Sequence, residues 1–187
     1  ETMGVALNFM RGSLKEYIKN LADATAEREK IESELRIAHE IQLSIIPKIF
    51  PPFPERKEVD LFATLQPARE VGGDLFDFFF LDEDHLCFAI GDVAGKGVPA
   101  SLFMAVTRTL LRSKASAGMK ASEIVHQINQ DLCRDNDMCI FVTFFLGILD
   151  LKTGHLNFCN AGHNPPVIVQ LDKSVKWMSI RNGLPLA

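Results

Sequence analysis

Two aspartates in a stretch rich in glycine and phenylalanine are the side chains of this chain best placed to do chemistry. Asp74 begins one apolar run and Asp92 ends a second, with the polar turn 82–85 between them. Both runs are rich in Phe, Leu and Ile, which favours a hairpin of two β-strands at about 71–81 and 86–93. A hairpin centred near Glu83 places Asp74 opposite Asp92, with their Cβ atoms ~5 Å apart.

Carboxylates this close repel each other unless they share a proton or a cation. A hard divalent cation is the simpler arrangement, because carboxylate oxygens are the ligands that such cations prefer. Alternation along each strand sets both aspartates at the rim of an apolar face. That face comprises Phe76, Phe78 and Phe80 beside Asp74, and Leu86, Phe88 and Ile90 beside Asp92. The alternative, acidic turn formers that bind nothing, is left open by the spacing alone.

The residues after Asp92 add a second indication. Gly95 and Gly97 let the backbone approach a ligand closely, and a helix is expected from about Pro99. The N-terminus of that helix favours anions such as phosphate. Lys96 lies between the two glycines and is either a phosphate contact or a solvated lysine in a turn. Paired carboxylates beside an anion-favouring turn suggest metal-assisted phosphate chemistry.

A long amino-terminal helix precedes these elements. Its seam residues recur at alternating steps of three and four, without a proline before Pro47. The seam comprises Leu7, Met10, Leu14, Tyr17, Leu21, Ala24, Arg28, Ile31, Leu35, Ala38, Gln42 and Ile45. One helix cannot bury such a stripe by itself, so we expect a homodimer through a coiled coil. Arg28 and Gln42 at a positions favour this over the alternative, a helix folded back on its own domain.

The rest of the chain predicts a layered α+β domain behind a proline-rich linker, residues 47–58. Strands are expected at 59–66, in the hairpin, and at 139–150, 155–160, 167–171 and 175–178, with helices at 99–117 and 122–132. Near-continuous apolar strands imply sheets buried on both faces. The inward side chains of the two helices are expected to be Leu102, Ala105, Val106, Leu110 and Leu111, then Ile124, Val125, Ile128 and Leu132.

Composition argues against several classes of function. The 187 residues carry a net charge of −4, which disfavours a nucleic-acid partner held by phosphate contacts. The four cysteines form no C-x-x-C pair and are interpreted as reduced, buried thiols. No long apolar run and no signal peptide occur, so we expect a cytoplasmic domain that neither spans a membrane nor is exported on its own.

Four motifs lie in order along the chain: GGDLFD at 72–77, GDVAGKGVPA at 91–100, FVT at 141–143 and NAGHNPP at 160–166. Together they resemble the SpoIIE/RsbU-type branch of the metal-dependent PPM serine/threonine phosphatases, and the resemblance covers about residues 35–187. It implies an α-β-β-α sandwich that holds two Mn²⁺ or Mg²⁺ ions between its sheets.

The resemblance also implies roles for single residues. The aspartate matching Asp92 bridges the two metals, and the backbone carbonyl of the next residue, Val93, is a further ligand. The aspartate matching Asp74 serves one metal directly or through water, so Asp74 and Asp92 are the candidate catalytic residues. Asp77 falls on the opposite face by alternation and is expected to be structural unless a bulge re-aims it. His163 is either a general acid near the substrate phosphate or a residue that shapes its loop.

The implied activity is hydrolysis of phosphoserine or phosphothreonine by a water that two metals activate. The implied substrate is a phosphorylated STAS-type anti-anti-sigma regulator. Residues 1–46 resemble the end of a HAMP signalling module continued by the coiled coil, and residues 59–187 carry the phosphatase domain. The family's further metal-binding aspartates come later than Ala187. We therefore expect a chain cut at both ends from a larger, membrane-tethered protein, and weak metal binding by this chain alone.

Other interpretations of the same residues are possible. A pseudophosphatase that only binds a partner, through its coiled coil and sandwich, is the main alternative. The Gly-Gly-Asp of residues 72–74 also resembles GGDEF nucleotide cyclases, but Leu75 and Phe76 stand where nucleotide chemistry needs an acidic residue. Residues 91–97 imitate a phosphate-binding P-loop, yet the glycines are one residue too close and Gly97 replaces the metal-binding Ser or Thr. The other histidines show no zinc spacing.

Overall fold

The computed structural model describes residues 2–67, 70–134, 136–179 and 183–187. The chain forms two compact units, residues 1–40 and 41–187. The first unit lies within a single helix, and the second holds the end of that helix, the two shorter helices and the described strands.

Helix α1 (Thr2–Ile45) is continuous over 44 residues, as expected from a stretch without proline. Ion pairs between neighbouring turns support it, with Arg28 Nε 2.8 Å from Glu32 Oε1. The side chain of Leu7 lies outside the described part, whereas Met10, Leu14 and Tyr17 of the predicted seam are exposed. Pairing through this seam stays a prediction. Within the described residues, no helix has an apolar stretch long enough to cross a membrane.

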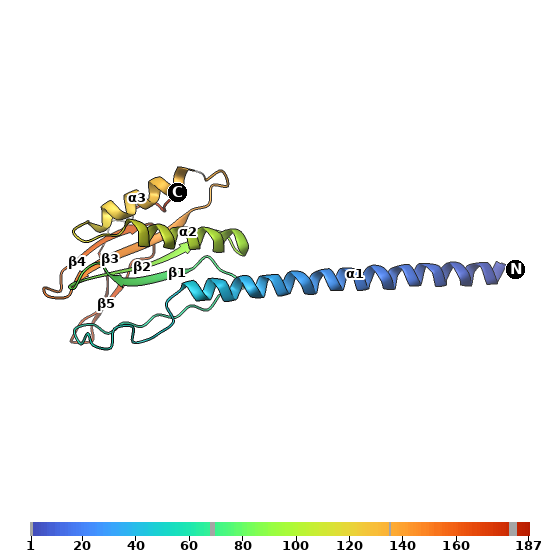
Figure 1. The fold of residues 1–187 in the computed structure, drawn as a ribbon, viewed down its shortest axis with the longest axis horizontal. Coiled ribbons are helices and arrows are strands. Elements are labelled where there is room, and N and C mark those ends of the chain that lie inside the picture. Colours follow the sequence, from blue (N-terminus) through green and yellow to red (C-terminus); the bar gives the residue numbers. More distant parts are fainter. Residues whose placement is uncertain (1, 68–69, 135, 180–182) are drawn as a thin grey trace. The chain divides into compact units, whose positions relative to one another are not determined.

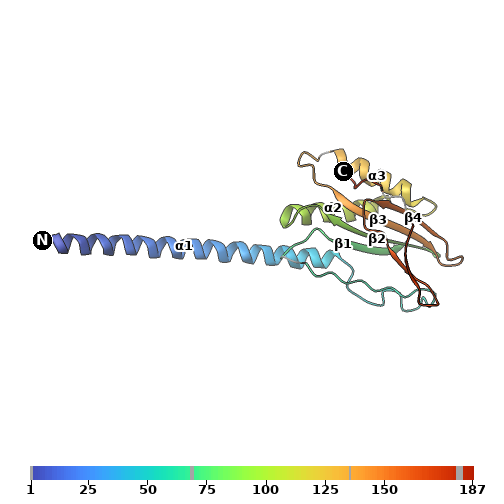
Figure 2. The same cartoon turned by 180° about the vertical axis from the view of Figure 1, so that it is seen from behind.

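The second unit is built on a four-stranded antiparallel sheet in the order β1-β2-β3-β4. Its strands are β1 (Leu75–Phe80), β2 (His85–Val93), β3 (Val142–Asp150) and β4 (Leu156–Ala161). Helices α2 (Val98–Lys114) and α3 (Ala121–Arg134) cover one face of this sheet (Figures 1 and 2). Strands β5 (Val167–Val169) and β6 (Val175–Trp177) pair separately as a two-stranded sheet.

The predicted hairpin register is confirmed. Leu75 pairs with Gly91 and Phe80 with Leu86, so the same register extends to Asp74 and Asp92 one residue beyond β1. Side chains alternate between the two faces, and Asp77 and Cys87 fall on the helix-covered face. Asp77 is fully buried there, where Arg112 of α2 donates to both of its carboxylate oxygens, at 2.7 and 2.6 Å. The structure thus places Asp77 away from Asp74, as alternation predicts.

The sequence pattern predicted the buried face of α3 better than that of α2. All four predicted inward residues of α3 are buried. The prediction for α2 was wrong in part, because Leu102 is 63% and Val106 50% exposed. The buried residues of α2 are Ala100, Met104, Thr107 and Leu111. A polar residue fits this face because the Thr107 hydroxyl donates to the carbonyl of Phe103 at 2.8 Å and is satisfied inside its own helix.

The face of β1 that carries Phe76, Phe78 and Phe80 is covered by the segment after α1. Phe53 packs edge-on against Phe80, with ring centroids 4.7 Å apart, and Phe50 lies 5.6 Å from Phe78. The strand predicted at 59–66 was wrong. Its alternation is real, since every second residue from 59 to 65 is half-buried, but no described strand pairs with it. The alternating pattern therefore predicted which residues are half-buried, but it did not predict the strand pairing correctly.

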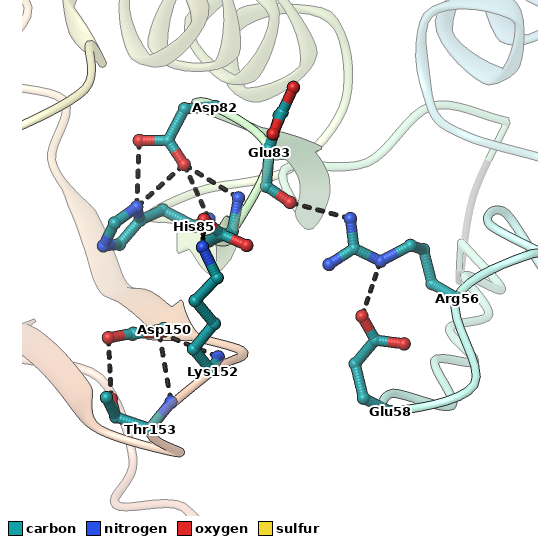
Figure 3. Close-up of polar contacts among 9 residues, drawn as sticks. Arg56, Glu58, Asp82, Glu83, His85, Asp150, Lys152 and Thr153 are labelled. Carbon is teal, nitrogen blue, oxygen red and sulfur yellow. Dashed lines mark hydrogen bonds and ion pairs between the residues drawn. The ribbon is translucent and has the colours of Figure 1, made fainter.

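Polar side chains tie the two hairpin turns together at the end of the sheet remote from Asp74 (Figure 3). Lys152 Nζ donates to Asp84 Oδ2 at 2.6 Å, joining the β3–β4 turn to the β1–β2 turn. Within the β1–β2 turn, Asp82 lies 2.8 Å from His85 Nδ1. This contact raises the pKa of His85, while the backbone N–H of Asp84 and then the imidazole lower the pKa of Asp82. The cluster stabilises the turns and leaves the opposite end of the sheet for the site.

The four cysteines are free thiols, but not all are buried as predicted. Cys87 is buried and Cys159 half-buried, whereas Cys133 and Cys139 are exposed. Cys139 precedes β3 instead of lying in it, and Cys133 lies outside the buried face of α3. Burial raises the pKa of Cys87 to about 12, so this thiol is unreactive at neutral pH.

Candidate active site

Four polar residues meet at one end of the sheet because neighbouring strands run antiparallel. Asp74 directly precedes β1, Asp92 lies at the end of β2, and Thr143 lies at the start of β3. Asp92 and Thr143 are paired in the β2–β3 register, and their side chains share a face. His163, in the loop after β4, joins them through a contact to Thr143.

The two aspartates interact directly. Partial burial raises the pKa of Asp74, and the negative charge of Asp92 and a hydrogen bond shared between the carboxyl groups raise it further. Carboxylates this close favour sharing a proton or a cation. A proton and a cation are expected to compete for two carboxylates that face one metal site.

A cavity of about 280 Å³ opens beside the pair. Asp74 and Asp92 line it together with Val93, Gly95 and Lys96. Gly97 is not part of the wall. It is the residue before the first turn of α2, at φ 74°, a left-handed conformation that favours glycine. Of the three residues predicted near phosphate in this turn, the structure therefore places two on the cavity.

Gly73 holds the backbones of the two site strands together. The amide of Val93 donates to the carbonyl of Gly73 at 3.3 Å. A Cβ at position 73 would lie 2.7 Å from the carbonyl oxygen of Val93, closer than any side chain tolerates. Glycine is required here because the Val93 carbonyl, a predicted metal ligand, lies where a side chain would otherwise stand.

His163 is fixed from two sides. Its Nδ1 lies 2.9 Å from the Thr143 hydroxyl, and its backbone N–H donates to Asn160 Oδ1 at 2.9 Å. Asn160 in turn donates to the carbonyl of His163 at 2.8 Å, so the amide side chain closes the loop. Burial lowers the pKa of His163, although Asp92 and Asp74 act in the opposite sense. The imidazole is therefore neutral at neutral pH and within electrostatic reach of both carboxylates.

Three of these supporting residues were not predicted from the sequence. Thr143 and Asn160 stood within motifs but had no role, and only the register between β2 and β3 reveals that Thr143 faces Asp92. Gln42 was assigned to the coiled-coil seam, which was wrong. It is only 4% exposed and bonds to the backbone of Gly72 inside the second unit. A heptad position cannot distinguish a polar residue facing a partner helix from one facing its own domain.

The site fits part of the shell of a hard cation. The described residues include no group of three or more His, Cys, Asp or Glu side chains arranged to hold a metal ion. They do offer two adjacent carboxylates and, beside them, Val93 on the wall of the same cavity. Oxygen ligands of this kind suit Mg²⁺ or Mn²⁺, and Mg²⁺ commonly retains several waters beyond one or two carboxylates.

Comparisons with known sequences agree on one family. The model of the family "Stage II sporulation protein E (SpoIIE)" matches residues 82–187, more than half of the chain. "Protein IcfG" of Synechocystis is 30% identical over 184 residues, which cover 83% of this chain and 28% of that protein. "Phosphoserine phosphatase RsbU" of Bacillus subtilis is 28% identical over 74% of this chain and 40% of that protein. The chain thus spans well under half the length of these relatives.

Solved structures show the same fold. The SiaA-PP2C domain of Pseudomonas aeruginosa superposes with a TM-score of 0.70 at 20% identity, over 86% of this chain and 64% of that one. The RsbU and RsbW domains of a Mycobacterium tuberculosis protein give a TM-score of 0.57 at 33% identity, over 64% of this chain and 33% of that one. The second unit therefore has the architecture of a PP2C phosphatase domain.

Proposed function

This chain belongs to the SpoIIE family of PP2C-type phosphatases, and we propose that it hydrolyses phosphoserine or phosphothreonine on a protein. One observation carries the proposal. Asp74 and Asp92 line the same cavity as Lys96, and the charge of Asp92 helps to raise the pKa of Asp74. His163 lies within electrostatic reach of both carboxylates. Adjacent carboxylates and a cationic side chain around one small cavity match the needs of a metal-assisted attack on a phosphate ester.

The residues divide the work by their chemistry. Asp92, Asp74 and the carbonyl of Val93 would hold two Mn²⁺ or Mg²⁺ ions. When bound, such ions supply a water that is nucleophilic at neutral pH and neutralise charge on the phosphoryl group. Lys96 adds a positive charge where the phosphate enters. Gly95, at φ 100°, lets the turn approach the phosphate without a side chain in the way.

His163 is assigned a place next to the substrate phosphate. Its pKa is lowered and its Nδ1 faces Thr143, so a neutral imidazole is held in one orientation. To donate a proton to the leaving seryl or threonyl oxygen, this imidazole would first have to take up a proton, which the charges of Asp92 and Asp74 favour. The alternative is that His163 only shapes its loop. The two hydrogen bonds between the Asn160 side chain and the His163 backbone fit that role equally well.

The substrate is proposed to be a phosphorylated STAS-type regulator protein. Support comes from the relatives, two of which are named phosphoserine phosphatases, RsbU and RsbP of Bacillus subtilis. The cavity of about 280 Å³ is consistent with a phosphorylated side chain presented by a protein surface.

We further propose that the protein is a homodimer through α1. The exposed apolar residues of the seam, such as Leu14 and Leu21, support this. Sedimentation velocity of the full-length protein at about 10–100 µM, where a weak coiled coil pairs, is expected to show a dimer. Leu14→Glu should shift it toward monomer, while Lys15→Glu, off the seam, should not. A wild-type monomer at these concentrations would contradict the proposal.

The activity is tested by measuring the phosphate that the full-length protein releases from phosphopeptides. Phosphoserine, phosphothreonine and phosphotyrosine peptides are offered with Mn²⁺, with Mg²⁺ and with excess chelator. We expect release from the first two peptides only, and loss of release with chelator. Absence of release with either metal would favour the non-catalytic binding role, and release from phosphotyrosine at an equal rate would refute the serine/threonine specificity.

A further inference from the structure

A buried glutamine lies in the last turn of α1. Gln42 is 4% exposed, and Ile46, one turn further on, is also buried. Both belong to the second compact unit, as does the segment that they face. A primary amide in such surroundings is stable only if its polar atoms are hydrogen-bonded, so its partner identifies its role.

The partner of Gln42 is the backbone of Gly72, at both of its polar groups. Gln42 Nε2 donates to the carbonyl of Gly72 at 2.5 Å, and the amide of Gly72 donates to Gln42 Oε1 at 3.1 Å. Two strands exchange the same pair of bonds in an antiparallel ladder. Gly72 precedes β1 and has no ladder partner in the described sheet, so the side chain of Gln42 takes the place of a neighbouring strand.

The segment before Asp74 is thereby held at two consecutive residues. Gln42 holds Gly72, and the amide of Val93 holds the carbonyl of Gly73 at 3.3 Å. Asp74 follows directly and lines the same cavity as Asp92. The backbone that sets the position of Asp74 is thus held by β2, through Val93, and by the end of α1, through Gln42.

We propose that Gln42 is a positioning residue that fixes Gly72–Asp74 and so couples the end of α1 to the carboxylate pair. This inference rests on the proposed function for the role of the pair. A turn of the helix end about its axis would withdraw the amide from Gly72. The freed N–H and C=O groups would then seek water, and the segment carrying Asp74 would move relative to Asp92.

Glutamine is the side chain that meets both needs. Glutamate keeps an acceptor for the Gly72 amide but has no donor for the Gly72 carbonyl, and it would bring a charge into a buried place. Methionine has nearly the same length and volume but bonds to neither group. The two variants therefore separate the hydrogen bonds from the packing.

The test uses the full-length protein with Gln42→Met and Gln42→Glu, and with Glu40→Gln as a matched control on an exposed position of the same helix. Amide hydrogen exchange is followed at residues 71–75. Binding of Mn²⁺ alone is measured by calorimetry, and turnover is measured with para-nitrophenyl phosphate. For Gln42→Met we expect about tenfold faster exchange confined to this segment, from the loss of two hydrogen bonds. Mn²⁺ affinity should fall severalfold, and kcat should fall with KM little changed.

The control should match wild type in all three measurements, and Gln42→Glu should exchange faster than wild type in the same segment. Unchanged exchange at Gly72 in Gln42→Met would overturn the inference. Faster exchange throughout the sheet in both Gln42 variants would also overturn it, because it would show a general structural role. The exchange result does not depend on turnover, so it separates failure of this coupling from failure of the proposed phosphatase activity.

Discussion

Asp92→Asn in the full-length protein is expected to lower metal-dependent phosphate release at least about a hundredfold. The substitution keeps the shape of the side chain and removes the negative charge that Asp92 presents beside Asp74. Mn²⁺ binding should weaken in parallel, because an amide is a poorer ligand than a carboxylate for a hard cation. Initial rates with a phosphoserine peptide and calorimetric titration with Mn²⁺ measure the two effects.

The matched control for this substitution is Asp172→Asn. Asp172 is an exposed carboxylate in the turn between β5 and β6, and it accepts a hydrogen bond from the backbone of Ser174. The substitution Asp172→Asn makes the same chemical change away from the cavity. It should leave phosphate release and Mn²⁺ binding at the wild-type level. Near-wild-type, Mn²⁺-dependent release by the Asp92 variant would remove the basis for the proposed function.

Asp77→Ala is expected to destabilise the domain by about 3–5 kcal/mol, the usual effect of removing one partner of a buried charge pair. The Asp77 side chain is fully buried, with Arg112 Nη2 at 2.6 Å and Arg108 Nε at 3.1 Å. Nε of Arg108 has no well-aligned hydrogen bond, so Asp77 is its nearest compensation. Without the carboxylate, the two neighbouring guanidinium groups would lose the negative charge that they share.

Urea unfolding measures this loss, and Asp131→Ala is the control. Asp131 also contacts two cations, Lys114 at 2.6 Å and Arg134 at 3.2 Å, but its side chain is partly exposed. Solvent screens such pairs, so the control should lose much less stability. Equal losses from the two variants would show that the buried network contributes no more than a surface pair.

The hairpin and its aspartates could be predicted from the sequence because the determinants are local. A short turn fixes the register of β1 and β2, so the position of Asp74 opposite Asp92 follows from their distances to Glu83. Alternation then assigned Asp77 to the other face, where Arg112 meets it. These inferences need no knowledge of the rest of the chain.

The supporting residues could not be predicted, because their partners are distant in sequence. Thr143 faces Asp92 only through pairing of strands separated by two helices. Gln42 follows a seam pattern, yet its amide bonds to Gly72, 30 residues away. Leu102 and Val106 lie on a helical stripe as regular as the buried one, and the buried stripe accepts Thr107 because its hydroxyl is satisfied within the helix. The sequence pattern predicts which residues share a face, whereas the tertiary structure determines what that face packs against.

The most direct test of the central claim is the position of bound metal. Crystals of the full-length protein grown with Mn²⁺ should give anomalous density in the cavity beside Asp74 and Asp92, at coordination distance from their carboxylate oxygens and the Val93 carbonyl. In Asp92→Asn crystals this density should fall or vanish. Wild-type crystals with Mn²⁺ bound elsewhere, and none between these two carboxylates, would contradict the account.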